Sequence, residues 1–188
     1  MTDFPIHTVE TAPDAAKPLL EKSQKAYNMI PNLHAAMATS PQLLEAYQVV
    51  GDLFSKTSLT ATERNVVWLS INVEHNCHYC VPAHTGIAKA QGVDDATIEK
   101  LRNAEPLDDA KLEALRQFTL KAVRQRGVVS EADVQTFLDA GYTQQTILDV
   151  MVGIAHKVMS NYVNHFVKTP VDDAFKKFDW TPRAVAAE

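Results

Sequence analysis

Apolar residues recur at three- and four-residue intervals along most of the chain, which is the period of an amphipathic helix. Four stripes stand out: Leu43, Tyr47, Val50 and Phe54; Val66, Leu69 and Val73; Leu112, Leu115, Phe118 and Ala122; and Ile147, Met151, Ile154 and Val158. No segment shows sustained two-residue alternation bounded by turn residues, so the pattern predicts no strand. We therefore expect an all-α fold.

Helix-start signals precede these stripes. Ser40 followed by Pro41 is an N-cap with proline at the first helical position. Thr60 with Glu63 is a capping box that opens a helix expected to end near His75 or Asn76. Further helices are expected after Pro106, from Ser130 to Gly141, and from Thr143.

Asn76 can also cap a new helix directly afterwards. In such a helix, positions three and four apart are neighbours, so Cys77, Cys80 and His84 would share one face. Gly92 is the expected stop of this helix. The two cysteines would then lie in its first turn.

We expect one domain, because 188 residues suit one sizeable core. Residues 1–17 lack periodicity and contain Pro5 and Pro13, which is typical of an arm, either extended or folded onto a partner subunit. Residues 18–188 would form the helical domain.

Composition and charge exclude several classes of protein. Hydrophobic residues make up 46% and charged residues 22%, unlike collagen-like or disordered chains. The formal net charge is −5, and no basic stripe could neutralise a run of phosphates, so we expect no nucleic-acid partner. The N-terminus lacks a signal-peptide pattern, and no apolar run approaches the ~20 residues of a membrane span, so we expect a cytoplasmic protein without membrane contact.

Cys77 and Cys80 are the only cysteines. A disulfide closing so short a loop would remove little unfolded-state entropy, so the pair indicates redox chemistry rather than a structural staple. The unpaired amides of a first helical turn lower a thiol pKa, and His84 one turn on can accept the proton, which makes Cys80 the better nucleophile. Cys77 can condense with a sulfenic acid on Cys80 to give a disulfide.

Other interpretations of the pair stay open. Tetrahedral zinc needs about four ligands, so His75, His78 or His84 would have to complete a site that lacks a second cysteine pair. Two buried free thiols that only pack are the simplest alternative. A c-type haem attachment is excluded, because Val81 rather than a histidine follows Cys80.

At these residues the sequence resembles the carboxymuconolactone decarboxylase-like family, and within it the alkyl hydroperoxidase D-like, peroxidase-related branch. The resemblance covers most of the chain from about residue 17. Its motifs are Asn76-Cys77-His78-Tyr79-Cys80 with His84, Leu59-Thr60-Ala61-Thr62-Glu63-Arg64, Ile30-Pro31-Asn32 and Ser40-Pro41, with weaker matches from Asn161 to Pro170.

The resemblance implies an all-helical bundle that assembles into homo-oligomers and reduces peroxide through the paired cysteines, without a cofactor or metal. In the family the second cysteine reacts with peroxide and the first resolves it, which would be Cys80 and Cys77 here. A histidine in the place of His84 belongs to the family's proton relay. An external dithiol protein would reset the pair.

The chain departs from that relay at two positions. The family's best-described members carry a glutamate twelve residues before the first cysteine and a histidine just before the second, where this chain has Asn65 and Tyr79. Neither titrates like a carboxylate or an imidazole near neutral pH. Glu74, three residues before Cys77, is the nearest replacement, although its position also suits an exposed helix-end carboxylate. Glu63 is better explained by the capping box.

The remaining polar residues near the motif are expected to be structural. His75 and His78 should lie at the surface, and Asn161 and His165 at a helix end that emerges into solvent rather than in a site wall. His156 should be an ordinary exposed or hydrogen-bonded histidine.

We therefore predict a cytoplasmic, cofactor-independent thiol peroxidase or disulfide reductase, in which Cys80 attacks peroxide, His84 manages the proton and Cys77 resolves the product. One alternative is a lactone decarboxylase, which needs a basic group and a carboxylate-binding cation near a cleft, and Arg64 is the one arginine near the motif. Another is a non-enzymatic interaction module, zinc-stabilised or purely helical.

Overall fold

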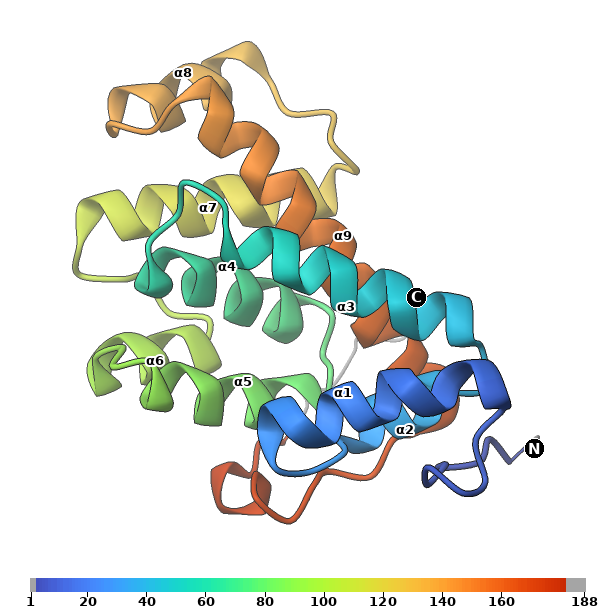
Figure 1. Ribbon diagram of the computed structural model, residues 1–188. Helices are drawn as coiled ribbons and strands as arrows, with labels where there is room; N and C mark the ends of the chain where they lie inside the picture. The colour runs from blue at the N-terminus through green and yellow to red at the C-terminus, as the bar shows by residue number, and fades with distance from the viewer. Residues whose placement is uncertain (1–2, 182–188) are drawn as a thin grey trace.

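Every helix that the sequence predicts is present in the computed structural model, which describes residues 3–181 (Figure 1). In chain order the helices are α1 (Lys17–Tyr27), α2 (Asn32–Met37), α3 (Pro41–Ser55), α4 (Ala61–Glu74), α5 (Cys80–Ala90), α6 (Asp95–Arg102), α7 (Ala110–Arg124), α8 (Glu131–Asp139) and α9 (Gln144–Val167), with 3₁₀ turns at Asp14–Ala16 and Lys176–Phe178. No strand occurs within residues 3–181, so the predicted fold class is confirmed.

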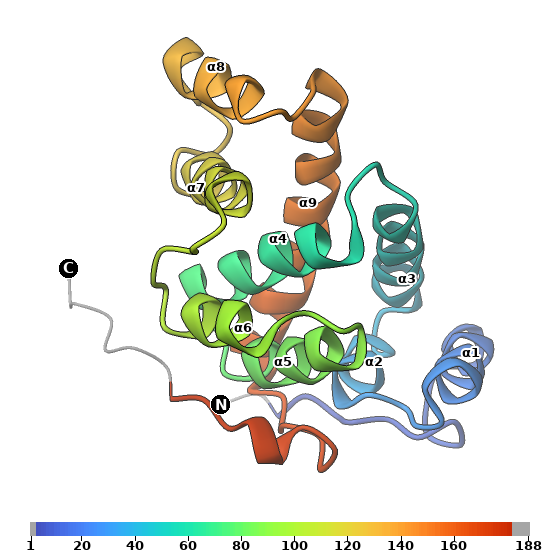
Figure 2. The same cartoon turned by 90° about the vertical axis from the view of Figure 1, so that its left-hand side faces the viewer.

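Helix α4 lies at the centre and packs against α5, α6, α7 and α9 (Figures 1 and 2). Residues 65–73 of α4 are buried without exception, which is the environment expected for a helix surrounded by others. The predicted capping box fixes its start. Thr60 Oγ1 accepts from Glu63 N at 3.2 Å, and the Glu63 carboxylate accepts from Thr60 N at 2.8 Å.

Two apolar clusters fill the interior. One joins α4 to α6, α7, α8 and the first half of α9, and the other joins α1, α2 and α3 to the start of α5. Trp68 belongs to the first cluster, and Tyr47 and Cys80 belong to the second, yet all three line the same cavity. The junction between the clusters is therefore where a ligand can reach the interior.

The N-terminal residues 3–13 contain no helix, and α1 begins at Lys17. This segment lies along α2, because His7 N donates to Ala35 O at 3.2 Å. Contact of the segment with a partner subunit stays a prediction. None of the helices between residues 3 and 181 has the length and apolarity that a bilayer crossing requires.

Helix α9 crosses α3 and α4 at Gly153, where there is no room for a side chain. An added Cβ would lie 2.8 Å from Phe54 Cε2 and 2.8 Å from Val67 Cγ1. We expect Gly153→Ala to lower the free energy of unfolding by about 1–3 kcal/mol through overpacking. This loss would outweigh the gain of about 1 kcal/mol in helix propensity.

Thermal and denaturant unfolding measure this effect. Ala155→Gly, on the exposed face of the same helix, is the matched control, because it changes helix propensity alone. A Gly153→Ala variant that is more stable than the parent chain would contradict the close packing of α9 on α3 and α4.

Candidate active site

Helix α4 ends in a Schellman motif that sets where the next helix begins. Asn76 has a left-handed conformation (φ 55°), its N–H donates to Val73 O at 3.0 Å, and Cys77 N donates to Asn72 O at 3.0 Å. The prediction that Asn76 caps a helix carrying both cysteines is therefore wrong. Asn76 closes α4, because a short polar side chain tolerates positive φ, and α5 begins only at Cys80.

Cys77 lies in the turn before α5 and accepts hydrogen bonds from the first N–H groups of that helix. Its carbonyl accepts from Val81 N at 3.2 Å, and its Sγ accepts from Cys80 N at 3.3 Å. Both cysteines are free and buried. The two sulfurs thus lie at the N-terminus of a helix, where unpaired N–H groups and the helix dipole favour an anion.

The two thiols differ in acidity. Burial alone would raise the pKa of Cys80, but the Cys77 hydrogen bond and the charge of Lys157 outweigh burial and lower this pKa to about 6. The polar side chains of Ser160 and Asn161 act in the same direction. The hydrogen bond that Cys77 donates to Cys80, together with burial, raises the pKa of Cys77. Near neutral pH the pair therefore holds a thiolate on Cys80 and a thiol on Cys77.

Helix α9 covers the sulfurs with buried polar groups. Asn164 Nδ2 donates to Cys80 Sγ at 3.1 Å and lies 3.8 Å from Cys77 Sγ. Lys157 precedes Asn164 by two helical turns and so lies on the same face of α9. Both side chains are fully buried, so the site is built from α5 below and α9 above.

Lys157 contacts an imidazole and two aromatic rings. Its Nζ lies 2.7 Å from His84 Nε2, 5.6 Å from the Trp68 ring centre and 5.8 Å from the Tyr47 ring centre. Burial lowers the pKa of Lys157 to about 8, against the opposing effect of the cysteines. Burial and the charge of Lys157 push the pKa of His84 well below its ordinary value, so the imidazole is neutral at pH 7.

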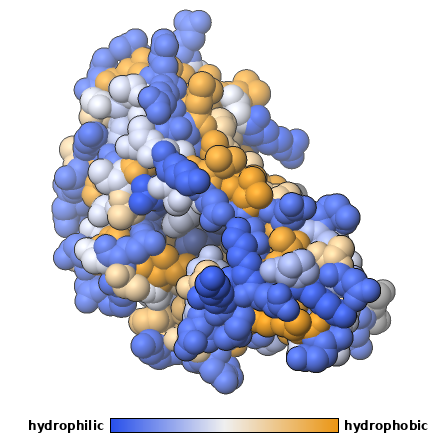
Figure 3. All heavy atoms as spheres, viewed as in Figure 1, coloured by the Kyte–Doolittle hydropathy of each residue, from blue (hydrophilic) through white to orange (hydrophobic). Residues whose placement is uncertain are grey.

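A cavity of about 640 Å³ extends to Cys80 and His84. The surface is hollowed at this place, between α1, α4 and α5 (Figure 3). The cavity lining is mostly apolar and aromatic, and includes Tyr27, Leu33, Tyr47, Trp68, Ile87 and Phe175. Cys77 and Lys157 do not line the cavity. A ligand would therefore meet Cys80 and His84 first.

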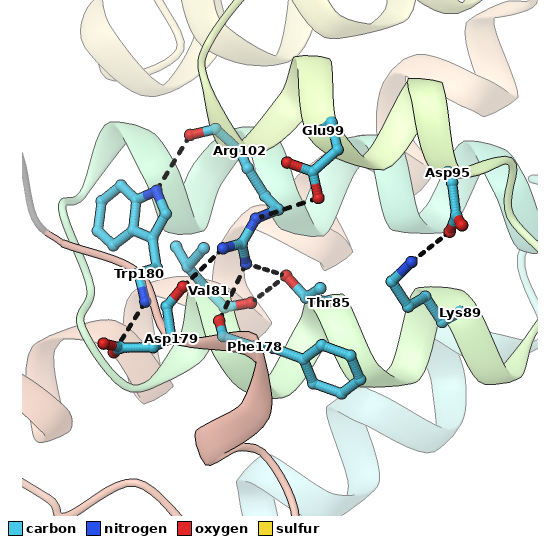
Figure 4. Close-up of polar contacts among 9 residues, drawn as sticks. All are labelled: Val81, Thr85, Lys89, Asp95, Glu99, Arg102, Phe178, Asp179 and Trp180. Carbon is cyan, nitrogen blue, oxygen red and sulfur yellow. Dashed lines mark hydrogen bonds and ion pairs between the residues drawn. The ribbon is translucent and has the colours of Figure 1, made fainter.

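The C-terminal segment closes one side of the cavity. Phe175 packs so tightly on α5 that a Cβ at Gly86 would lie 2.9 Å from its ring. The guanidinium of Arg102 holds the segment in place (Figure 4). It donates to the carbonyl oxygens of Phe178 at 3.1 Å and Asp179 at 2.7 Å. The cavity wall thus combines elements from both ends of the chain.

The residues considered for the proton relay lie elsewhere. The Glu74 carboxylate accepts two hydrogen bonds of 2.7 Å from Arg124 of α7 and lines a second, smaller cavity. Asn65 is buried and donates to Ala61 O at 2.9 Å and to Gln91 Oε1 at 2.8 Å. The structure therefore brings together Cys77, Cys80 and His84, but not Glu74.

Tyr79, which precedes Cys80, ties the C-terminal segment to the site. Its hydroxyl donates to Asp172 Oδ2 at 2.5 Å and accepts from Leu33 N at 3.3 Å. Burial and the charge of Asp172 raise the pKa of Tyr79, so its hydroxyl stays protonated. Tyr79 therefore connects the start of α5 to the C-terminal segment and to α2.

Two histidines that flank the motif are partly buried and hydrogen-bonded. His75 Nδ1 lies 2.9 Å from Asn161 Oδ1, and His78 Nε2 donates to Thr169 O at 2.9 Å. Asn161 is fully buried and donates to Asn72 Oδ1 at 2.9 Å, so the expectation that it emerges into solvent is wrong. Within residues 3–181, no three side chains of His, Cys, Asp or Glu are grouped so that they could hold a metal ion.

Sequence reasoning missed three groups on α9. His156 is buried, lines the cavity and stacks on Tyr47 at 4.3 Å, although we expected an ordinary histidine. Lys157 and Asn164 were not considered at all. A signal was available, because Lys157, Asn161 and Asn164 recur at helical spacing beside the apolar stripe. The same spacing is typical of the exposed polar face of a helix, and only the burial of these residues in the structure shows that they belong to the site.

Comparison of the sequence with known proteins gives one family match. The sequence model described as "Carboxymuconolactone decarboxylase family" matches residues 41–121, a segment that includes α4, both cysteines and His84. No curated protein matches the chain.

Several solved structures share the fold. One is described as an alkylhydroperoxidase AhpD core, an uncharacterized peroxidase-related protein from Ralstonia eutropha JMP134 (TM-score 0.83, 21% identity, 96% of this chain and 97% of that chain). Another is an uncharacterized peroxidase-related protein from Silicibacter sp. TM1040 (TM-score 0.78, 22% identity, 93% and 92%). A third is the debrominase Bmp8, as a cysteine-to-alanine variant in complex with 2,3,4-tribromopyrrole (TM-score 0.78, 13% identity, 94% and 95%).

The hydrogen bond from Asn164 predicts an effect on thiol acidity. We expect Asn164→Ala to raise the pKa of Cys80 by about one unit, since a hydrogen bond to the charged form favours that form. The rate of alkylation by iodoacetamide between pH 5 and pH 9 measures this pKa.

Glu74→Gln is the control, because Glu74 pairs with Arg124 and does not line the cavity. It should leave the alkylation profile of Cys80 unchanged. If Glu74→Gln shifted the pKa of Cys80 more than Asn164→Ala did, Glu74 rather than Asn164 would be the residue that acts on the thiol.

Proposed function

We propose that the chain is a thiol-dependent peroxidase, because the carboxymuconolactone decarboxylase family model matches residues 41–121 and a structure described as an alkylhydroperoxidase AhpD core shares the fold. The observation that carries the proposal is the pair of unlike thiols at one end of a cavity. Cys80 has a pKa lowered to about 6 and lines the cavity, and Cys77 lies directly behind it with a raised pKa. This is the arrangement that a reacting and a resolving cysteine need.

The proposed reaction has two steps. The Cys80 thiolate attacks the terminal oxygen of a hydroperoxide, the O–O bond breaks, and an S–OH group forms while the departing alkoxide takes up a proton. The Cys77 thiol then attacks the Cys80 sulfenic acid, so that a disulfide forms and water leaves. An external dithiol protein reduces the disulfide and returns both thiols, and no cofactor or metal takes part.

His84 is the proposed proton donor to the departing oxygen. It lines the cavity beside Cys80, and its neutral ring carries one N–H. A general acid must lie within hydrogen-bond reach of the atom that it protonates. Glu74 has no part in the proposal, because its carboxylate pairs with Arg124.

The setting of this chemistry remains part of the proposal. Peroxide reduction by a dithiol fits a reducing compartment, and the cytoplasm is the location that we propose. A homo-oligomer is the assembly that we propose. Neither statement is needed for the chemistry of the two cysteines.

A second candidate is reductive dehalogenation of an aromatic substrate. The cavity of about 640 Å³ is lined mostly by apolar and aromatic groups and is far larger than hydrogen peroxide requires, and a debrominase shares the fold. In that reaction the Cys80 thiolate would take the halogen from a protonated ring. Cys77 would then displace halide and form the same disulfide.

The lactone decarboxylase alternative has less support. That reaction needs a cation to hold a carboxylate in the cleft. Of the described residues that line the cavity, Lys22 is the one lysine or arginine, and it pairs with Asp52 at 3.2 Å. Arg64, the arginine considered for this role, does not line the cavity and donates to the carbonyl oxygen of Leu59.

Substitution of each cysteine tests the assignment of roles. With cumene hydroperoxide and dithiothreitol, Cys80→Ser should lose turnover entirely. Without dithiothreitol, Cys77→Ser should still react once with cumene hydroperoxide and accumulate a sulfenic acid on Cys80, which dimedone traps and mass spectrometry detects. Equal peroxide consumption by the parent chain and both variants would contradict the proposal.

Comparison of substrates separates the two candidate reactions. If the chain is a peroxidase, cumene hydroperoxide should oxidise the thiol pair to a disulfide within seconds, and 2,3,4-tribromopyrrole should release no bromide. The free-thiol content and ion chromatography of bromide give the two readouts. Bromide release that depends on Cys80, with no reaction with hydroperoxide, would favour dehalogenation.

A further inference from the structure

Lys157 is a buried cation without a carboxylate partner. Its side chain is fully buried and its Nζ contacts His84 Nε2 at 2.7 Å. Within the described part of the chain, no carboxylate forms an ion pair with it. Burial of an unpaired ammonium is unfavourable by several kcal/mol, so a compensating charge is required.

The titratable groups that face Lys157 come from four helices. They are Tyr47 of α3, Cys80 and His84 of α5, the neighbouring His156 of α9, and His34 of α2, with Cys77 in the turn before α5. The pKa values of the three histidines are lowered, to about 4 for His34, so these rings are neutral near pH 7. The pKa values of Tyr47 and Cys77 are raised, so both stay protonated.

The Cys80 thiolate is therefore the anion available to Lys157. Each charge stabilises the other, since Lys157 lowers the pKa of Cys80 and Cys80 raises the pKa of Lys157. The π faces of Trp68 and Tyr47 add a weaker attraction for the ammonium. The two groups are therefore coupled, and both charges are present together between about pH 6 and about pH 8.

The contact with Lys157 also sets the tautomer of His84. An ammonium can only donate, so His84 Nε2 accepts and the ring proton lies on Nδ1. His84 Nδ1 is buried and has no hydrogen-bond partner among the described residues. Because His84 lines the cavity, this N–H is the donor left for a bound substrate.

We propose that Lys157 is a positioning residue that acts as the counter-ion of the Cys80 thiolate and as the source of the proton that His84 passes to the departing oxygen. This inference rests on the proposed function and deepens it.

The Cys80 thiolate forms an S–O bond with the terminal oxygen of the hydroperoxide, and the O–O bond breaks. The departing alkoxide takes the Nδ1 proton of His84, and His84 Nε2 takes a proton from the ammonium of Lys157. The products are a sulfenic acid, an alcohol and a neutral amine. Lys157 loses its charge in the same step in which Cys80 loses its own, so no uncompensated buried charge is left.

The test compares Lys157→Met, which removes the charge at similar volume, with Lys157→Arg, which keeps it. Both are made in a Cys77→Ser background, so that Cys80 is the one thiol and its neighbour can still donate a hydrogen bond. Lys121→Met, which removes a lysine paired with Asp133 away from the cavity, is the matched control. The readout is the pH profile of alkylation by iodoacetamide, with thermal unfolding to verify the fold.

We expect Lys157→Met to raise the pKa of Cys80 by at least one unit, which slows alkylation at pH 6 by about fivefold or more. Lys157→Arg should restore most of the rate, and Lys121→Met should change nothing. A folded Lys157→Met variant with an unchanged alkylation profile would overturn the inference. If Lys157→Met slows alkylation as expected but the parent chain does not turn over peroxide, the inference stands and the proposed function fails. The two failures are therefore distinguishable.

A second measurement keeps the test decisive if Lys157→Met does not fold. In Cys80→Ser the thiolate is absent and Lys157 is intact, so the pKa of Lys157 should fall by at least one unit relative to the parent chain. Carbon-13 NMR of the lysine Cε resonances as a function of pH reports this value. An unchanged titration of Lys157 would overturn the inference.

Discussion

A thiolate can persist in a protein interior only if the surrounding groups replace the solvation that burial removes. Cys80 is almost fully buried, and burial alone would make it a weaker acid than an ordinary cysteine. Its acidity therefore depends on groups that come from outside its own helix. Cys77 and Lys157 are joined by Ser160 and Asn161, and the Asn164 amide donates a hydrogen bond to the sulfur. The packing of α9 over the start of α5 supplies all of these groups except Cys77. The fold matters to the chemistry mainly because it holds these two helices together.

The close approach of α9 depends on local features that are far from the sulfurs. Gly153 lets α9 lie directly on Phe54 and Val67, and the Schellman motif at Asn76 turns the chain so that Cys80 opens α5 beneath α9. The C-terminal segment then covers the remaining side, through Arg102 and Tyr79. As a result Cys80 lines the cavity and Cys77 does not.

The sequence predicted the architecture well, because helix signals are local. The capping box at Thr60 and the proline after Ser40 mark helix starts that the structure has at the same positions. The start of α5 was misplaced, since an asparagine before a helix can cap that helix or close the preceding one, and only the backbone conformation decides between the two. The helices at 17–27, 32–37 and 95–102 carried no pattern strong enough to predict.

The sequence predicted only those site residues that lie close together along the chain. Cys77, Cys80 and His84 are close in sequence, so helical spacing was enough to group them. Lys157 and Asn164 lie more than seventy residues away, and their importance comes from burial against α5, which no local pattern reveals. Glu74 looked suitable by spacing along the chain, but Arg124 of α7 determines where its carboxylate lies.

The most direct test of this account is the ionisation of the reduced thiol pair, followed by the thiolate absorbance near 240 nm as the pH is raised from 4 to 10. The account predicts one thiolate per chain with a midpoint near pH 6, and a second thiol that stays protonated through pH 9. Two thiols that ionise together at about 8.5 or above would contradict it, because both would then be ordinary or inert sulfur.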